Sequence, residues 1–515
     1  MDAGRDIDTG ADGQSSLLSE WSSPSGSEIP NAGAAPEIGT RILFLTSEIT
    51  DLLKAGGLGE ISAALPRVLC REGLDVRVLM PGYRAVMQKA AGMQVVAELP
   101  AEHALPASKL GLFQAADGLL LYVVICPELY DRDGSPYGDE QGADFADNDL
   151  RFARLGLAAA EIAAGLPGLD WQPELVHAND WPTALAPAYM TWRGVRTPSI
   201  MTVHNLAYQG VFDRNRLGAL GIPEAAYDTN GVEFYGKMSF LKAGLFYASH
   251  LTTVSPTYAR EILTPEMGCG LDGLLRQRAD RGQLTGILNG IDDSYDPQSD
   301  PHLDHHFSSN DFSGKQNNAA DVRAAFGLDA SAGPLFAVVS RLVHQKGVDL
   351  VVDSANAIIQ EGGQVVATGQ GEPALERAMT ELAERNPGAV GVKIGFEETL
   401  ARRMYAGSDF LLMPSRFEPC GLSQMYAQRF GSLPIARNTG GLADTIQDNV
   451  TGFLFDKASA ISLRRTIHRA LRAFRGRQVM QRMKSAAMRR PGGWGDAATS
   501  YQDLYSRAID GVAVG

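Results

Sequence analysis

The sequence predicts an α/β protein made of two doubly wound parallel sheets, and three observations predict that class. The chain has 515 residues, which at roughly 100 to 200 residues per domain is too long for one core. Short apolar runs alternate with longer amphipathic segments, as in parallel strands that are buried on both faces and separated by helices. A polar stretch at 292–318 interrupts the series. We therefore expect two Rossmann-like domains that face a central cleft.

The apolar runs predict the strands in order. The first series lies at residues 42–46, 76–80, 119–126, 175–176, 200–203 and 251–254, and the second at 335–340, 364–368, 390–394, 410–413, 433–436 and 453–455. These limits predict an N-terminal domain at 40–290 and a C-terminal domain at 291–495. Residues 1–39 are rich in Gly, Ser, Ala and Asp without periodicity, so we expect a disordered tail. Residues 496–515 are expected to form a helix that packs back on the first domain.

Composition excludes several classes of protein. Forty-six Lys and Arg against sixty Asp and Glu leave a net charge of −14, which repels polyanions, so we expect no nucleic-acid partner. The apolar stretches are far shorter than the ~20 residues of a membrane helix, and the N-terminus lacks the pattern of a signal peptide. We expect a cytoplasmic protein without membrane association. The four cysteines are too dispersed for a CxxC pair or a disulfide framework.

Polar residues that follow the first series of strands indicate a ligand site, because open parallel sheets bind ligands at the carboxyl ends of their strands. The sequence KAGGLG at 54–59 predicts a loop whose backbone amides can approach a phosphate, although a plain turn is an equally open interpretation. His177 and His204 each follow a strand, and a catalytic role and a packing role are about equally favoured. His177 and Asp180 have no third ligand at a recognisable spacing, so we expect no metal.

The second series adds basic groups and a carboxylate. Arg341 and Lys346 stand five apart after a predicted strand, where they can clamp a diphosphate. An exposed basic turn is the alternative. Glu418 precedes a predicted helix, and its alternative role is a helix cap. The sequence TGG at 439–441 predicts a second helix that opens on glycines.

A rival motif lies at 369–374, where GQGEPA fits the dinucleotide fingerprint G-x-G-x-x-A. An acid, Glu372, stands where the pyrophosphate would lie, and the position expected for the ribose acid is Gly391. The sequence therefore disfavours a nicotinamide enzyme. The basic groups, glycine-opened helices, carboxylate and histidines together favour transfer of a group away from a diphosphate, without a cofactor.

Several long motifs closely resemble the bacterial glycogen synthases and plant starch synthases. They are KAGGL (54–58), HNLAYQG (204–210), SPTYA (255–259), NGID (289–292), SRLVHQKG (340–347), SRFEPCGL (415–422) and TGGLADT (439–445). The resemblance runs from about Arg41 to near the C-terminus. It implies a retaining glucosyltransferase of the GT-B fold. Such an enzyme elongates glycogen by adding glucose from ADP-glucose to the non-reducing end of an α-1,4-glucan.

The resemblance also implies roles for individual residues. Glu418 would lie beside the transferred glucose, Arg341 and Lys346 would neutralise the departing diphosphate, and His204 would support the oxocarbenium-like sugar. The other implied substrate-binding residues are Lys54, Gly56 and Gly57 on the donor, Asp147 and Asn148 near the acceptor, and Asn205, Gln345, Cys420, Gly421, Leu422, Thr439, Gly440 and Gly441.

This chain departs from the family pattern at three positions. Ala55 replaces a threonine, Pro182 replaces a histidine, and Tyr426 stands where many GT-B enzymes have a second glutamate. The first two lie beside the implied anchors, so we expect them to affect fine specificity more than activity.

Two other classes of function stay open. A glycoside hydrolase would need two carboxylates about 5 to 10 Å apart and no diphosphate clamp, so Arg341 and Lys346 argue against it. A glucan-binding protein without activity would have less reason to keep Glu418 and the basic pair. No oligomeric state is predicted.

Overall fold

A computed structural model describes residues 39–513 of the chain. The predicted tail at 1–39 lies outside the described residues, apart from its last position. No helix in the described part is long and apolar enough to cross a bilayer.

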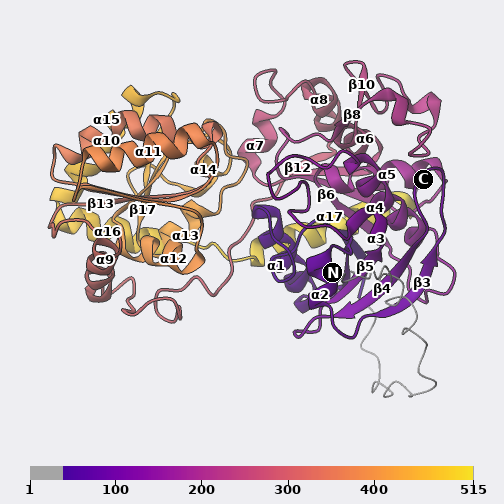
Figure 1. The fold of residues 1–515 in the computed structure, drawn as a ribbon, viewed down its shortest axis with the longest axis horizontal. Helices are drawn as coiled ribbons and strands as arrows, with labels where there is room; N and C mark the ends of the chain where they lie inside the picture. The colour runs from indigo at the N-terminus through magenta and orange to yellow at the C-terminus, as the bar shows by residue number, and fades with distance from the viewer. Residues whose placement is uncertain (1–38, 514–515) are drawn as a thin grey trace, which may run out of the picture. The chain divides into compact units, whose positions relative to one another are not determined.

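The first sheet has nine strands in the order β12-β11-β7-β6-β1-β2-β5-β4-β3 (Figure 1). Neighbours from β12 to β5 pair in parallel, whereas β4 and β3 pair antiparallel at the edge. The predicted parallel strands of the first series are confirmed. The strands are β1 (Arg41–Leu45), β2 (Asp75–Pro81), β3 (Gln94–Leu99), β4 (Ser108–Gln114), β5 (Leu120–Ile125), β6 (Leu175–Asn179), β7 (Ser199–Val203), β11 (His250–Thr253) and β12 (Leu284–Gly286).

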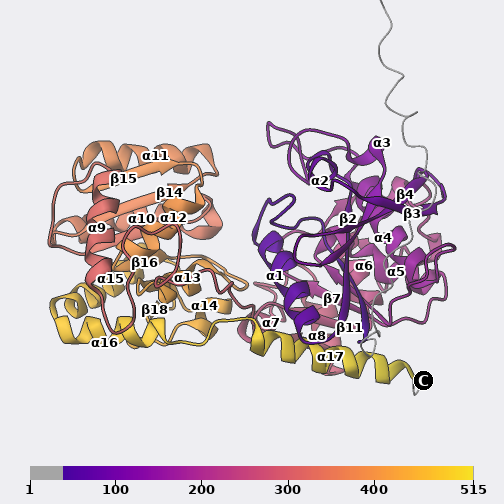
Figure 2. The same cartoon turned by 90° about the horizontal axis from the view of Figure 1, so that it is seen from below.

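Eight α-helices lie between these strands in the sequence. They are α1 (Gly57–Arg71), α2 (Arg84–Lys89), α3 (Pro127–Tyr130), α4 (Asn148–Ala163), α5 (Leu185–Trp192), α6 (Phe240–Tyr247), α7 (Pro256–Glu261) and α8 (Asp272–Asp280). The last helix of the chain, α17 (Gly495–Ala513, yellow in Figure 2), packs against α1 and β6. Its Tyr505 hydroxyl lies 2.7 Å from Nδ1 of His177, so His177 takes a packing role.

The second sheet has six parallel strands in the order β15-β14-β13-β16-β17-β18. Every predicted run of the second series is one of them: β13 (Leu335–Val339), β14 (Gln364–Gly369), β15 (Val390–Ile394), β16 (Phe410–Met413), β17 (Leu433–Arg437) and β18 (Phe453–Phe455). The helices are α9 (Ser313–Ala325), α10 (Val348–Ile359), α11 (Pro373–Arg385), α12 (Glu398–Gly407), α13 (Ser423–Arg429), α14 (Gly440–Thr445), α15 (Ala460–Arg475) and α16 (Arg477–Met488).

Both faces of the second sheet are buried, which explains why its strands are apolar throughout. In β13, Phe336 and Val338 enter one core, while Ala337 and Val339 enter the other. This alternation follows from the two-residue period of a strand. Helices α10, α11 and α15 cover one face, and α9, α12 and α13 cover the other (Figure 1). The doubly wound arrangement is thereby confirmed for this half of the chain.

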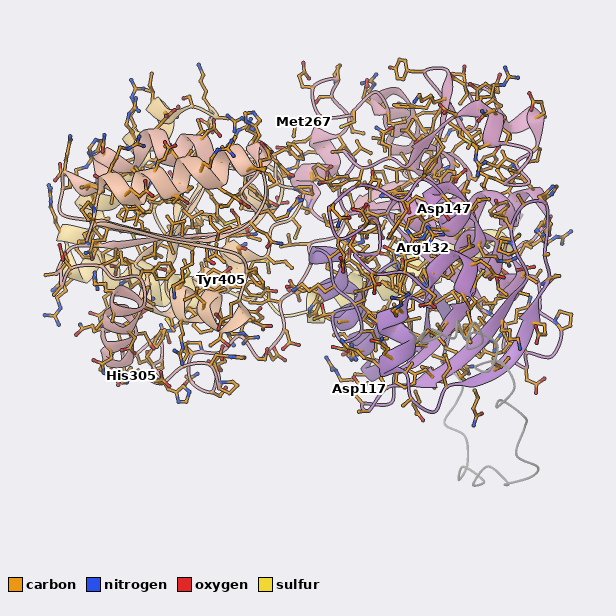
Figure 3. All side chains as sticks on the ribbon, in the orientation of Figure 1. Asp117, Arg132, Asp147, Met267, His305 and Tyr405 are labelled. Atoms are coloured by element: carbon orange, nitrogen blue, oxygen red, sulfur yellow. The ribbon has the colours of Figure 1, made fainter. Side chains whose placement is uncertain are left out.

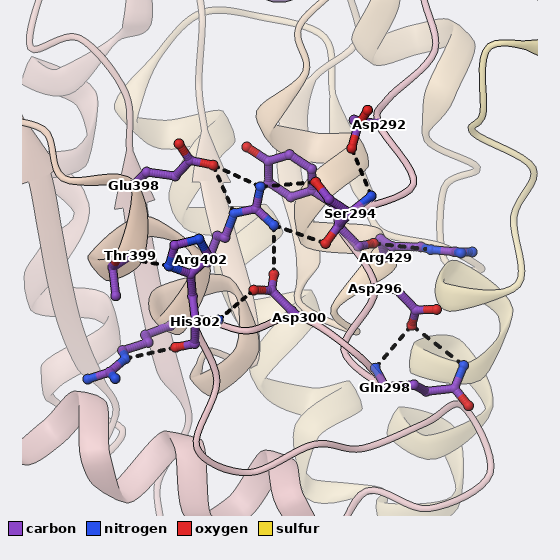
Figure 4. Close-up of polar contacts among 12 residues, drawn as sticks. Asp292, Ser294, Asp296, Gln298, Asp300, His302, Glu398, Thr399, Arg402 and Arg429 are labelled. Atoms are coloured by element: carbon purple, nitrogen blue, oxygen red, sulfur yellow. Dashed lines mark hydrogen bonds and ion pairs between the residues drawn. The ribbon is translucent and has the colours of Figure 1, made fainter. Parts of the chain in front are cut away.

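The polar stretch between the sheets is anchored by Arg402 of α12 (Figure 4). Its guanidinium donates to Asp300 Oδ2 over 2.8 Å and to the Ser294 carbonyl over 3.0 Å, and it stacks 3.8 Å from the centre of the Tyr295 ring. Helix α9 begins inside the same stretch. These contacts fix a segment that composition alone describes as a polar interruption. The domain limits drawn from it stay predictions.

Candidate active site

The carboxylate after β16 is buried and forms an ion pair with a partly exposed lysine. Glu418 is only 5% exposed, and its Oε2 accepts hydrogen bonds from Lys346 Nζ at 2.6 Å and from Ser415 Oγ at 2.9 Å. Helix α13 begins at Ser423 with Leu422 as its N-cap residue, so the alternative role of Glu418 as a cap is wrong. The strand end thus brings together one acid and one base that lie far apart in the sequence.

The two residues of the predicted basic clamp, Arg341 and Lys346, differ in exposure and in contacts. Lys346 closes the short helix η4 (His344–Lys346) and points to Glu418. Arg341 is exposed, and its Nη1 lies 3.5 Å from the Tyr208 hydroxyl. Gln345 contacts the Glu418 loop through a 3.3 Å hydrogen bond from Nε2 to the Phe417 carbonyl. Arg341 is therefore free to turn toward a ligand, while Lys346 is held in place.

The second glycine-opened helix, α14, supports the backbone of the Glu418 loop. A Cβ on Gly440 would lie 2.0 Å from the Glu418 carbonyl oxygen, and one on Gly441 would lie 2.1 Å from the Cys420 carbonyl oxygen. Gly440 also has a φ of 45°, which favours glycine. These positions need glycine because two backbones meet here.

An internal carboxylate occupies the N-terminus of α14. Glu261 accepts the Gly440 amide with both of its oxygens at 3.1 Å and the Thr439 hydroxyl at 2.9 Å. The favourable position for an anion at a helix N-terminus is thus filled from α7. We did not predict Glu261, which lies 179 positions from Gly440.

Cys420, Gly421 and Leu422 complete this loop. Burial raises the pKa of Cys420 to about 12, so its thiol is neutral. Gly421 has a φ of 73°, and Leu422 caps α13.

His204 follows β7 and is held as an uncharged imidazole. Its Nε2 lies 2.9 Å from Asn179 Oδ1, while the Asn179 amide nitrogen donates to the Leu45 carbonyl. The Asn179 oxygen is therefore the acceptor, and Nε2 of His204 carries the proton. Burial lowers the pKa of His204 to about 3. Its Nδ1 is buried and has no hydrogen-bond partner in the described part of the chain, so it can accept a hydrogen bond from a ligand.

Asp180 fixes the backbone at this strand end. Its Oδ1 accepts the amides of His204 at 2.7 Å and Asn205 at 3.3 Å, and burial raises the pKa of Asp180 to about 7. The Asn205 side chain accepts the Ala207 amide. Asp180 directly follows the buried strand β6, and the sequence alone presents it only as a possible metal ligand.

The glycine loop after β1 contains a second internal carboxylate. Glu48 Oε2 accepts the amides of Ala55 and Gly56, each at 2.7 Å. A Cβ on Gly57 would meet no atom within 4 Å, so the first turn of α1 is the part that stays open to a ligand. Lys54 forms an ion pair with Glu60, and the Tyr426 hydroxyl donates to the other Glu60 oxygen over 2.9 Å.

The predicted acceptor residues Asp147 and Asn148 begin helix α4. Both oxygens of Asp147 bind Arg132, at 2.6 and 2.5 Å (Figure 3). Burial raises the pKa of Asp147, but Arg132 outweighs it and the net pKa is lowered. The Asn148 side chain bonds Arg151 and the Tyr137 carbonyl inside the protein, so it positions the helix start.

Comparisons with known proteins agree over most of the chain. A family model described as the starch synthase catalytic domain matches residues 41–277, and one described as glycosyl transferases group 1 matches 327–489. A glycogen synthase of Pseudomonas putida is 60% identical over 469 residues, which are 91% of this chain and 90% of the relative. A glycogen synthase of Pseudomonas aeruginosa is 56% identical over 93% of each chain.

Solved structures give the same result. The catalytic domain of starch synthase IV from Arabidopsis thaliana, bound to ADP and acarbose, has a TM-score of 0.81 at 30% identity and covers 92% of this chain and 100% of its own. Sucrose-phosphate synthase from Thermosynechococcus elongatus has a TM-score of 0.58 at 17% identity over 92% of this chain and 100% of its own, and supports the fold alone. The predicted GT-B fold is thereby confirmed.

Proposed function

The chain belongs to the glycogen synthase family of glycosyltransferases, and we propose that it transfers glucose from ADP-glucose to the non-reducing end of an α-1,4-glucan with retention. One observation carries the assignment of residues: a Lys346–Glu418 ion pair with a buried carboxylate at the end of β16, and the exposed cation Arg341 at the end of the neighbouring strand β13. The starch synthase IV structure was solved with ADP and acarbose, which supports an ADP-linked donor here.

Arg341 and Lys346 act on the leaving group. When the bond between glucose C1 and the diphosphate breaks, negative charge grows on the diphosphate oxygens. The two cations stabilise that charge more in the transition state than in the ground state. The proton of the attacking glucan hydroxyl passes to the departing diphosphate, so no protein base is required. This arrangement supplies the positive charge that a metal ion supplies in other transferases.

Glu418 and His204 act on the sugar. The carboxylate of Glu418 stabilises the positive charge that develops near C1, and Lys346 holds it in place. The free Nδ1 of His204 accepts a hydrogen bond from a hydroxyl of the transferred glucose. Burial keeps this imidazole uncharged, Asn179 fixes its direction, and Asp180 fixes its backbone.

A glycosidase explains the site less well. Such an enzyme needs a carboxyl group that donates a proton to the leaving oxygen. Glu418 Oε2 instead accepts two hydrogen bonds, one from an ammonium and one from a hydroxyl, which suits a group that stabilises positive charge on the sugar.

ADP release measured with ADP-glucose and glycogen tests the assignment, with UDP-glucose run in parallel and a control without glycogen. We expect glycogen-dependent ADP release that exceeds UDP release. Equal release without glycogen would instead indicate hydrolysis, and absence of release with either donor would contradict the proposed activity.

A further inference from the structure

A tyrosine occupies the tip of a hairpin whose geometry suits a different residue. Strands β9 (Glu233–Phe234) and β10 (Lys237–Ser239) pair through Phe234 and Lys237, so Tyr235 and Gly236 form a two-residue loop. Their φ angles are 49° and 81°. Such loops favour Asn-Gly or Asp-Gly, because both central residues have positive φ. A tyrosine is strained at a positive φ. Because this unfavourable residue brings no structural benefit, we interpret the position as functional.

The Tyr235 ring is held on one side and exposed on the other. It is 79% exposed, yet it packs edge-on to Phe234 with centroids 4.8 Å apart. A Cβ on Gly270 would lie 3.0 Å from Tyr235 Cε2, so the ring rests against the backbone of the loop after α7. The same loop contains Met267, which Figure 3 labels. Nothing within the fold requires this ring to be aromatic, because most of its surface faces solvent.

This surface continues to the candidate active site. Gln209 Nε2 donates to the Cys269 carbonyl over 3.0 Å, beside Gly270. The preceding residue, Tyr208, is also exposed, and its hydroxyl lies 3.5 Å from Arg341 Nη1. Among the large apolar residues that the structure describes, the exposed aromatic ones are Tyr208, Tyr235 and Phe396. The centre of the Phe396 ring lies 5.9 Å from Lys54 Nζ, so two of the three exposed rings, Tyr208 and Phe396, lie beside basic residues of the candidate site.

We propose that Tyr235 forms an outlying subsite for the α-1,4-glucan acceptor, at which its exposed ring face stacks on a glucose unit beyond the reacting end. The C–H face of a glucose ring is apolar while its edge carries hydroxyls, so a fixed aromatic plane beside polar side chains matches it. Glu233 and Lys237 flank the loop and supply such polar groups. The proposal rests on the proposed function, since it names a second contact with the same acceptor.

The variant Tyr235→Asn separates binding from folding. Asparagine suits the loop better than tyrosine, so the melting temperature should stay equal or rise. Loss of the ring should raise KM for glycogen about tenfold, as expected for one stacking contact, with a smaller rise for maltotriose. Tyr235→Trp should keep KM for glycogen within about twofold of the wild type. Ile461→Ala, which removes an exposed apolar side chain on α15, is the matched control.

Retardation in native gels that contain glycogen gives a readout independent of transfer. The wild type and Tyr235→Trp should be retarded, and Tyr235→Asn should migrate faster. Unchanged retardation and unchanged KM for glycogen in Tyr235→Asn would overturn the subsite. Absence of any transfer by the wild type would contradict the proposed function instead, and the gels would still decide the subsite.

Discussion

The carboxyl ends of the two sheets differ in the charge of the side chains that they carry. At the second sheet, the buried Glu418 forms an ion pair with the partly exposed Lys346, and Arg341 adds an exposed cation. At the first sheet, burial lowers the pKa of His204 to about 3, so the imidazole is uncharged, and raises the pKa of Asp180 to about 7, so its carboxyl is ionised only in part at neutral pH. The difference matches a substrate with a charged leaving group at one end and a neutral sugar at the other.

The two strand ends also differ in the free energy that it costs to bury their polar groups. A buried carboxylate such as Glu418 is costly to desolvate, and its ion pair is weak evidence for stability, which fits the catalytic role proposed for this residue. A neutral imidazole with one free nitrogen costs less to bury and still orients a hydroxyl. Substitutions at the second sheet should therefore change mainly kcat, whereas substitution of Asp180 at the first sheet should change the pH dependence of stability.

Lys346→Ala should have the largest effect. It removes a cation and leaves Glu418 buried without its ion-pair partner, so kcat should fall by about 10²-fold or more and unfolding free energy by about 3 kcal/mol. Steady-state kinetics and thermal melting check both effects. A wild-type kcat would show that Lys346 is only a structural partner of Glu418.

Arg341→Ala should lower kcat by about 10²-fold without changing stability, because the side chain is exposed and has no carboxylate partner among the described ion pairs. Comparison of its melting temperature with that of Lys346→Ala separates catalysis from folding. If Arg341→Ala keeps full kcat, the arginine is a surface charge on a turn.

Asp180→Asn should change the pH dependence of stability. The raised pKa of Asp180 means that the native state favours the protonated carboxyl, so wild-type stability from this group is lost as the pH rises from about 4 to 7. Asparagine keeps an oxygen for the His204 amide and does not titrate. The melting temperature of the variant relative to the wild type should therefore rise over that interval, and a constant difference would contradict the shifted pKa.

Chelation should have the smallest effect. Because Arg341, Lys346 and backbone amides already provide positive charge, EDTA should change kcat by less than about twofold. Complete loss that added divalent metal restores would mean that the charged side is incomplete without a metal.

The parallel strands could be predicted because burial on both faces makes each one a continuous apolar run, as in β13. Strand β3, at the edge of the sheet, and its neighbour β4 were missed because both include exposed positions, so neither forms a continuous apolar run. The sheet of β8 (Val211–Phe212), β9 and β10 was missed because two or three residues carry no periodic signal.

The sequence placed His204 and Arg341 just after strands, and the structure has them there, while their roles in the site stay predictions. Contacts that join distant segments had no local signal. Glu261 meets Gly440 across 179 positions, and Tyr426 meets Glu60 across 366. The predicted phosphate-binding role of the first glycine loop stays a prediction, with Glu48 now known to occupy part of it.

The most direct test of the central claim is kcat of Glu418→Gln at saturating ADP-glucose and glycogen, measured with its melting temperature. Glutamine keeps the size and an oxygen acceptor for Ser415 but removes the charge that faces the developing cation. We predict a fall in kcat of roughly 10²-fold or more, with melting reduced less than in Lys346→Ala. A destabilised variant with wild-type kcat would contradict the account, because it would make Glu418 a structural partner of Lys346 and nothing more.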